Sequence, residues 1–289
     1  MIPKINNISY IPFKALHPIR IEEIEEDTKW NHTTRFFRYS QCGEPTDEAL
    51  IMLMQRKNSP VNILSAGCSY GEEVYTFATA CRAYGINARI KGVDISPLAI
   101  EVAKEGVYTL DALEEEYISV EDKYKQNYRA KVTSMFKAMF EKSPKNESRW
   151  EAKDGEFMNC SFEARNISDL GTTEEENSQD LILCRYVLYH IDNLQTLRQT
   201  INGFYTILKP GGLLSLNSQE YEKYEELLQL QGFKQPYRAM PWIFQKPHKD
   251  NFKIYLNEAN INQNPNLKQI SKEKVLSYKP NLNDIYKSF

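Results

Sequence analysis

A strand that leads into a glycine turn and then a helix constrains the fold of this chain more than any other feature. Residues 61–66, Val-Asn-Ile-Leu-Ser-Ala, have the length and mostly apolar character of a buried strand, and Gly67 follows them directly. A second glycine, Gly71, precedes a helical pattern that runs from Glu73 to Tyr84. Glycines in such a turn let the backbone approach a ligand closely. The pattern is typical of α/β folds that bind a ligand at the end of a strand.

The alternation of strands and helices continues along the chain. The expected strands are 88–95, 158–167, 180–184 and 213–216. The expected helices are 97–104 and 194–208. Ser96 is expected to cap the first helix, and residues 209–212 to end the second. This alternation predicts the α/β class, with a mostly parallel sheet and helices on both faces. Right-handed crossovers bring the carboxyl ends of the strands to one edge, where ligands of such sheets bind.

The composition divides the chain into three segments. We expect an N-terminal arm at 1–30, a main domain at 31–246 with a polar insert at about 110–157, and a basic extension at 247–289 that is either a tail or a lid. Acidic runs at 22–27, 114–116 and 174–176 are expected to be solvated.

Charge and cysteine content exclude several functions. The chain has 36 Lys and Arg against 39 Asp and Glu, a net charge of −3 that does not suit nucleic-acid binding. The five cysteines are scattered without a Cys-x-x-Cys pair and the four histidines are dispersed, so neither a disulfide framework nor a metal site is expected. No apolar run is long enough to span a bilayer and no signal peptide is recognisable, so we expect a cytoplasmic protein without membrane insertion.

The glycine turn does not have the sequence of a phosphate-binding loop. Gly67 and Gly71 lie four apart, no third glycine follows, and an acid, Glu72, opens the helix. A carboxylate at this position repels phosphate and favours a cationic ligand. The alternative is a plain tight turn in which Glu72 and Glu73 complement the helix dipole.

An acid also ends the second strand. In dinucleotide-type folds a carboxylate at the position of Asp94 accepts hydrogen bonds from ribose hydroxyls. The alternative is that Asp94 caps the next helix, although Ser96 is better placed for that role. The turn and this acid together indicate an adenosine-containing ligand without a bound pyrophosphate, and S-adenosylmethionine (SAM) fits that description.

Several motifs, in this order and spacing, resemble the chemotaxis-receptor glutamate methyltransferases of the CheR type. They are Thr34-Arg35-Phe36-Phe37-Arg38, Ala66-Gly67-Cys68-Ser69-Tyr70-Gly71-Glu72-Glu73, Gly92-Val93-Asp94-Ile95, Phe162-Glu163-Ala164-Arg165-Asn166-Ile167, Cys184-Arg185-Tyr186-Val187-Leu188 and Leu208-Lys209-Pro210-Gly211-Gly212 with Ser218-Gln219-Glu220. The first two are the most specific. The resemblance covers about residues 34–220.

The resemblance implies a class I, Rossmann-like SAM methyltransferase with a mostly parallel seven-stranded sheet. It implies methyl transfer from SAM, with S-adenosylhomocysteine (SAH) as product, to a glutamate carboxylate of a protein such as a receptor-like helix. A hairpin insert that docks receptors is placed at 137–162, a Lys-rich stretch whose strand signals are weak.

The resemblance also assigns residues to SAM. They are Thr34 and Arg38, Ala66, Gly67 and Glu72, Asp94, Asn166 and Ile167, and Arg185 and Tyr186. It places Arg38 near the methionine carboxylate or the acceptor, Glu72 at the amino group, and Asp94 at the ribose. Asn166 and Ile167 border the adenine. A surface ion pair for either arginine, or a turn role for Asn166, is the alternative at those positions.

Two departures from the family pattern bear on the acceptor. Tyr186 stands where the family usually has Asn, and His190 stands where it usually has Tyr. Arg38 and His190 are the catalytic candidates. His190 is either a core residue or a base or hydrogen-bond donor on the acceptor side. The acceptor is therefore a protein carboxylate, another protein group or a small molecule, and a non-catalytic SAM-binding protein is the third hypothesis. Cys68 and Cys184 are expected to be small buried residues.

Overall fold

The computed structural model describes residues 34–38, 46–57, 60–110, 114–115, 118, 127–144 and 146–248, without the side chains of residues 146 and 148. The arm at 1–30 and the extension beyond residue 248 lie outside these residues. The chain divides into two compact units, which are described separately. The first unit is Met1–Val61 with Cys68–Arg165, and the second is Asn62–Gly67 with Asn166–Phe289.

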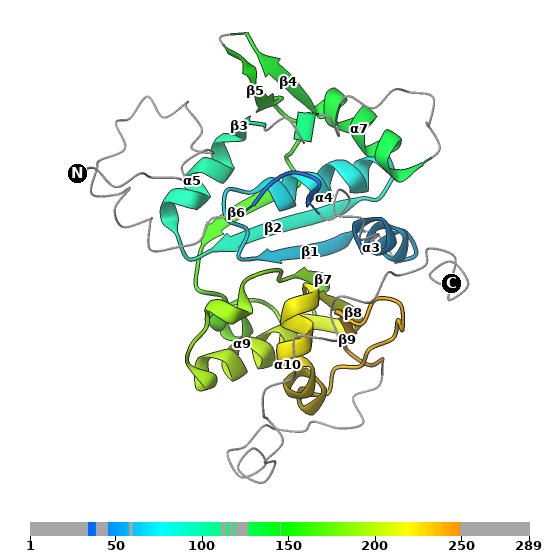
Figure 1. Cartoon of the computed structure of the whole chain (residues 1–289), viewed down its shortest axis with the longest axis vertical. Helices are drawn as coiled ribbons and strands as arrows, with labels where there is room; N and C mark the ends of the chain where they lie inside the picture. The colour runs from blue at the N-terminus through cyan, green and yellow to red at the C-terminus, as the bar shows by residue number, and fades with distance from the viewer. Residues whose placement is uncertain are drawn as a thin grey trace, which may run out of the picture. The chain divides into compact units, whose positions relative to one another are not determined.

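The first unit contains a parallel pair of strands and the helices connected to them (Figure 1). Strand β2 (Ala88–Asp94) pairs with β6 (Cys160–Ala164), and helices α3 (Thr46–Gln55), α4 (Glu72–Ala83) and α5 (Pro97–Glu105) belong to the same unit. The side-chain oxygen of Ser96 accepts a hydrogen bond from the Ala99 amide at 3.1 Å, which confirms the predicted cap of α5.

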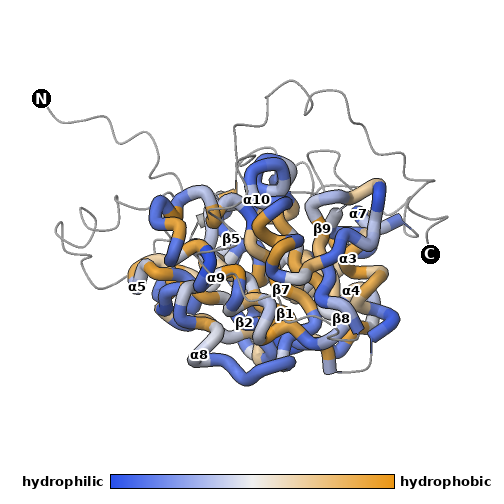
Figure 2. The backbone as a smooth tube through the Cα atoms, turned by 90° about the horizontal axis from the view of Figure 1, so that it is seen from below, coloured by the Kyte–Doolittle hydropathy of each residue, from blue (hydrophilic) through white to orange (hydrophobic). Residues whose placement is uncertain are grey.

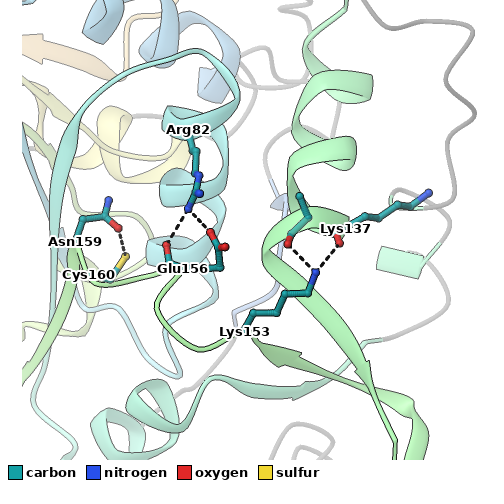
Figure 3. Close-up of polar contacts among 7 residues, drawn as sticks. Arg82, Lys137, Lys153, Glu156, Asn159 and Cys160 are labelled. Carbon is teal, nitrogen blue, oxygen red and sulfur yellow. Dashed lines mark hydrogen bonds and ion pairs between the residues drawn. The ribbon is translucent and has the colours of Figure 1, made fainter.

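A small antiparallel sheet follows in the same unit. Its order is β3 (Val107–Thr109), β5 (Asn146–Ala152) and β4 (Phe140–Ser143), and helix α7 (Tyr128–Met139) leads into it. The Nζ of Lys153 donates to the carbonyls of Lys137 and Ala138 at the end of α7 (Figure 3). Strands β4 and β5 form a hairpin within residues 137–162, where strand signals in the sequence are weak.

An aromatic cluster fills the space between α4, α7 and the small sheet. Its members are Phe36, Phe37, Tyr75, Tyr108, Phe136, Phe140, Trp150, Phe157 and Phe162. The Phe36 ring meets the rings of Tyr108 and Phe136 edge-on at 4.9 and 5.4 Å, and the Phe136 and Phe140 rings are stacked at 4.3 Å. Edge and offset contacts of this kind stabilise beyond the burial of area. The cluster therefore holds Phe36 and Phe37 against α7.

The second unit contains four strands in the order β1 (Val61–Ala66), β7 (Gln179–Leu183), β8 (Leu208–Ser215) and β9 (Ile243–Gln245). The first three are parallel and β9 is antiparallel to β8. The helices of this unit are α8 (Leu170–Thr173), α9 (Leu194–Ile207) and α10 (Ser218–Gln231), with short 3₁₀ turns at Ile167–Asp169 and Leu188–His190. Figure 2 shows the hydrophobic character of β1 and β7, as expected of buried parallel strands.

The α/β class is confirmed, and the predicted strands and helices recur within a few residues of their expected bounds. One boundary is wrong: residues 209–212 do not separate a helix from a strand, because β8 already begins at Leu208 and runs through them. Of the seven strands that the resemblance implied, six lie in the described residues outside the small sheet. Within that same part of the chain, no helix is long and apolar enough to cross a membrane.

Candidate active-site residues

The predicted ribose ligand, Asp94, organises the glycine turn of the first unit. Its Oδ2 accepts a hydrogen bond from the Ser69 amide at 2.8 Å and its Oδ1 accepts one from the Ser96 amide at 3.0 Å. Each carboxylate oxygen has a further lone pair with which it can accept from a hydroxyl. Asp94 therefore shapes the turn and remains suited to ribose, while Ser96 takes the role of helix cap.

Glu72 is a buried carboxylate. It is the first residue of α4, its side chain is almost fully buried, and neither of its oxygens accepts a hydrogen bond in the described part of the chain. Burial is the main reason that the pKa of Glu72 is raised to about 8. Its own backbone amide opposes this rise, the Glu114 carboxylate adds to it, and the Thr34 side chain opposes it. An unpaired buried acid is costly, so this position suits a cationic ligand.

A second acid in this unit lies where solvated charge was expected. Glu114 is fully buried, and its Oε1 accepts a hydrogen bond from the Phe36 amide at 2.6 Å. The expectation that the run at 114–116 is solvated is therefore wrong for Glu114, although Glu115 is partly exposed. The Phe37 amide donates to the Thr76 hydroxyl at 3.2 Å. These two bonds hold the segment that carries Thr34 and Arg38, both of which are half-buried.

The remaining predicted cofactor residues belong to the second unit. Ala66 ends β1 and is buried, and Gly67 has φ +80° with Val187 packed against it. Arg185 is buried beyond the end of β7, and Ile167 is buried at the start of a 3₁₀ turn. The Oδ1 of Asn166, an exposed residue, accepts from the Ser168 amide at 3.0 Å, so the turn role expected as the alternative is present.

Backbone strain coincides with the predicted motifs. The described non-glycine residues with positive φ are Phe37 (55°), Ser69 (50°), Asn177 (54°) and Tyr186 (65°). Asn tolerates this conformation, but bulky residues such as Phe and Tyr adopt it at a cost. Phe37, Ser69 and Tyr186 each belong to a different motif of the predicted cofactor site. Strain of this kind persists where the surroundings over-determine it, and it clusters at functional sites.

The catalytic candidate His190 is exposed, so it is not a core histidine. Its ring lies 4.2 Å from the ring of Tyr189, which in turn meets Tyr186 edge-on at 6.4 Å. Cys68 and Cys184 are buried as predicted, and burial raises the pKa of the Cys68 thiol, which keeps it neutral.

Sequence reasoning missed the roles of two acids. No pattern signals Glu114, because its burial depends on a partner 78 positions away. Glu220 was part of a quoted motif without an assigned role, yet it is buried and accepts hydrogen bonds from three consecutive amides. The described residues contain no group of three or more His, Cys, Asp or Glu side chains that could hold a metal ion.

Comparison with known proteins assigns the chain to a class. The family described as "CheR methyltransferase, SAM binding domain" matches residues 32–231. Together with the α/β fold, this match defines a SAM-dependent methyltransferase, and SAM is its cofactor. The chain belongs to the CheR methyltransferase family.

Several similar proteins are named chemotaxis protein methyltransferases. The chain is 26% identical over 228 residues to a chemotaxis protein methyltransferase of Borreliella burgdorferi, which covers 74% of each chain. It is 22% identical over 226 residues to chemotaxis protein methyltransferase 2 of Vibrio cholerae, covering 76% of this chain and 70% of the relative. It is 30% identical over 173 residues to a chemotaxis protein methyltransferase of Campylobacter jejuni, covering 55% of this chain and 54% of the relative.

Proposed function

We propose that this protein methylates a side-chain carboxylate, that of a glutamate, on a protein acceptor. The observation that carries the proposal is the family match from residue 32 to 231, supported by relatives named chemotaxis protein methyltransferases. The proposed catalytic domain spans residues 31–246. The proposed compartment is the cytoplasm, as the five scattered cysteines without a Cys-x-x-Cys pair lead us to expect.

The cofactor residues are proposed as the motifs assign them. Glu72 binds the amino group of SAM, because its buried carboxylate accepts no hydrogen bond within the described residues and suits a cation. Asp94 binds the ribose, and Asn166 with Ile167 borders the adenine. The other proposed contacts are Thr34, Arg38, Ala66, Gly67, Arg185 and Tyr186.

The proposed mechanism relies on alignment rather than proton transfer. When bound, SAM would supply a methyl group on a positively charged sulfur. The acceptor oxygen would gain that methyl group while the carbon–sulfur bond breaks, and the sulfur would keep the electron pair and leave as SAH. A carboxylate acceptor is already ionised at neutral pH, so no residue of the chain has to remove a proton. The protein orients the reactants, and good alignment contributes on the order of 7–11 kcal/mol. Arg38 is proposed to hold either the methionine carboxylate or the acceptor carboxylate.

The experiment that tests the acceptor uses methyl-labelled SAM and lysate of the source cell. We expect label on protein that mild alkali releases as volatile methanol, because carboxyl methyl esters are alkali-labile. Asp94→Asn protein serves as the control and is expected to transfer no label. Alkali-stable label, or label confined to small molecules, would contradict the carboxylate acceptor.

A second candidate function rests on His190. Its exposed imidazole, in contact with Tyr189, is able to take a proton from an amine, phenol or hydroxyl acceptor. His190→Phe should leave SAH binding unchanged in either case. Slowed transfer with unchanged binding would favour the base and an acceptor other than carboxylate, whereas unchanged turnover would remove that role. SAM binding without any transfer would favour a non-catalytic SAM-binding protein.

A further inference from the structure

One carboxylate of α10 binds the loop that follows β7. The Oε2 of Glu220 accepts from the Tyr186 amide at 2.8 Å, and its Oε1 accepts from the amides of Val187 and Leu188 at 2.6 and 2.7 Å. Three consecutive backbone donors therefore converge on one side chain more than thirty positions away. Hydrogen bonds to an ionised acceptor are stronger than neutral ones.

Helix α10 holds this carboxylate in place. The Nδ2 of Asn217 donates to the Oε2 of Glu220 at 2.7 Å, and the Oδ1 of Asn217 caps the helix by accepting from the Gln219 and Glu220 amides. The Tyr224 hydroxyl donates to the Leu188 carbonyl at 3.3 Å. The loop is thus bound through both its amides and a carbonyl.

The bound loop contains a strained residue. Tyr186 has φ +65°, a conformation that a tyrosine adopts only at a cost in free energy. The hydrogen bond from its own amide to Glu220 opposes that cost. Tyr186 and its neighbour Arg185 are also proposed SAM contacts, so their directions depend on this backbone conformation.

We propose that Glu220 is a positioning residue for SAM binding: its carboxylate holds Tyr186 in the left-handed conformation and thereby directs the Arg185 and Tyr186 side chains. This inference rests on the proposed cofactor contacts of those two residues. Glu220 itself touches neither SAM nor the acceptor in this scheme.

The test is SAH affinity, measured by calorimetry on the full chain. Glu220→Gln keeps the size of the side chain but removes its charge, and we expect about tenfold weaker SAH binding. Glu226→Gln makes the same change at an exposed position of α10 and should leave affinity unchanged. Amide exchange at 186–188 should accelerate only in Glu220→Gln.

A second substitution separates positioning from general destabilisation. Asn tolerates positive φ, so Tyr186→Asn lowers the cost that Glu220 opposes. In the Tyr186→Asn background, Glu220→Gln should weaken SAH binding by less than about threefold. An equal loss in both backgrounds would overturn positioning, because Glu220 would then act through stability alone.

Two further variants keep the test decisive. If Glu220→Gln does not fold, Asn217→Ala removes the donor that holds the Glu220 carboxylate, and Asn193→Ala removes a comparable cap from α9 as its control. Only Asn217→Ala should weaken SAH binding. The SAH affinity of Glu72→Gln is measured alongside. If Glu72→Gln binds SAH more weakly but Glu220→Gln does not, this inference alone is overturned. If neither variant binds SAH more weakly, the proposed cofactor site is contradicted.

Discussion

At the scale of single residues, local backbone requirements carry the clearest information. Gly67 and Gly71, which the sequence identified as turn residues, both have positive φ, and Asp94 lies at the end of its strand as predicted. The burial of Glu72 and Glu114 was less predictable. These two side chains are buried by residues that are distant in the sequence, so no local sequence pattern predicts their burial.

Gly67 has no space for a side chain, and its substitution therefore tests the packing against Val187. A Cβ there would lie 2.4 Å from a methyl carbon of Val187, whereas a Cβ at Gly85 would meet nothing within 4 Å, and both glycines have positive φ. Gly85→Ala should therefore cost about 1 kcal/mol from conformation alone. Gly67→Ala should cost roughly 2–4 kcal/mol, because a steric clash is added. Chemical denaturation of both variants measures the difference, and equal costs would contradict the close packing against Val187.

The raised pKa of Glu72 predicts how stability depends on pH. The folded protein without ligand holds this proton up to about pH 8, while an ordinary glutamate loses it near 4.5. The folded state therefore binds more protons between these values, and its stability falls as pH rises through that window. Glu72→Gln should lack this loss, which amounts to a few kcal/mol. Denaturant titrations at pH 5 and pH 8.5 provide the comparison; the same pH dependence in both proteins would contradict a raised pKa.

At the scale of elements, apolar runs were predictable and polar strands were not. Strands β1 and β7 are buried and mostly apolar, with Ile63-Leu64 in β1 and Leu181-Ile182-Leu183 in β7, so their sequences identify them. Strands β4 and β5 consist mainly of polar and charged residues, and Trp150 of β5 is buried against Phe136. Tertiary contacts rather than local preference define this hairpin.

The aromatic cluster predicts a large cost for one truncation. Phe136 is fully buried, stacks on Phe140 and contacts Phe36 and Phe37. Phe136→Ala should destabilise the protein by about 3–5 kcal/mol, because it leaves a cavity among these rings. Met158→Ala changes a side chain that is 89% exposed and should stay within about 0.5 kcal/mol of wild type. Similar unfolding midpoints for the two variants would contradict this account of the cluster.

At the scale of the whole molecule, the fold class followed from the order of strands and helices, and the family followed from the order of motifs. The identity of the acceptor did not follow from either order. A substitution such as His190 for the usual Tyr bears on the choice of acceptor without changing the fold. Helix α10 was also missed, because its polar sequence lacks a clear apolar stripe.

Ligand binding should stabilise the whole molecule. SAH at 100 times its Kd adds about 2.7 kcal/mol to the free energy of unfolding. For a chain of this size we expect a Tm increase of roughly 5–10 °C. Thermal unfolding with and without SAH measures the shift, and Asp94→Asn should abolish it. A full shift in Asp94→Asn would contradict the proposed ribose contact.

The buried acid at the start of α4 has a consequence for ion exchange. Near neutral pH most unliganded molecules carry a proton on Glu72, so in the proposed complex the incoming ammonium group takes that proton's place. At this one carboxylate, a positive charge enters as another leaves. Binding should therefore release a proton to the buffer, and the measured binding heat should vary with the ionisation enthalpy of the buffer.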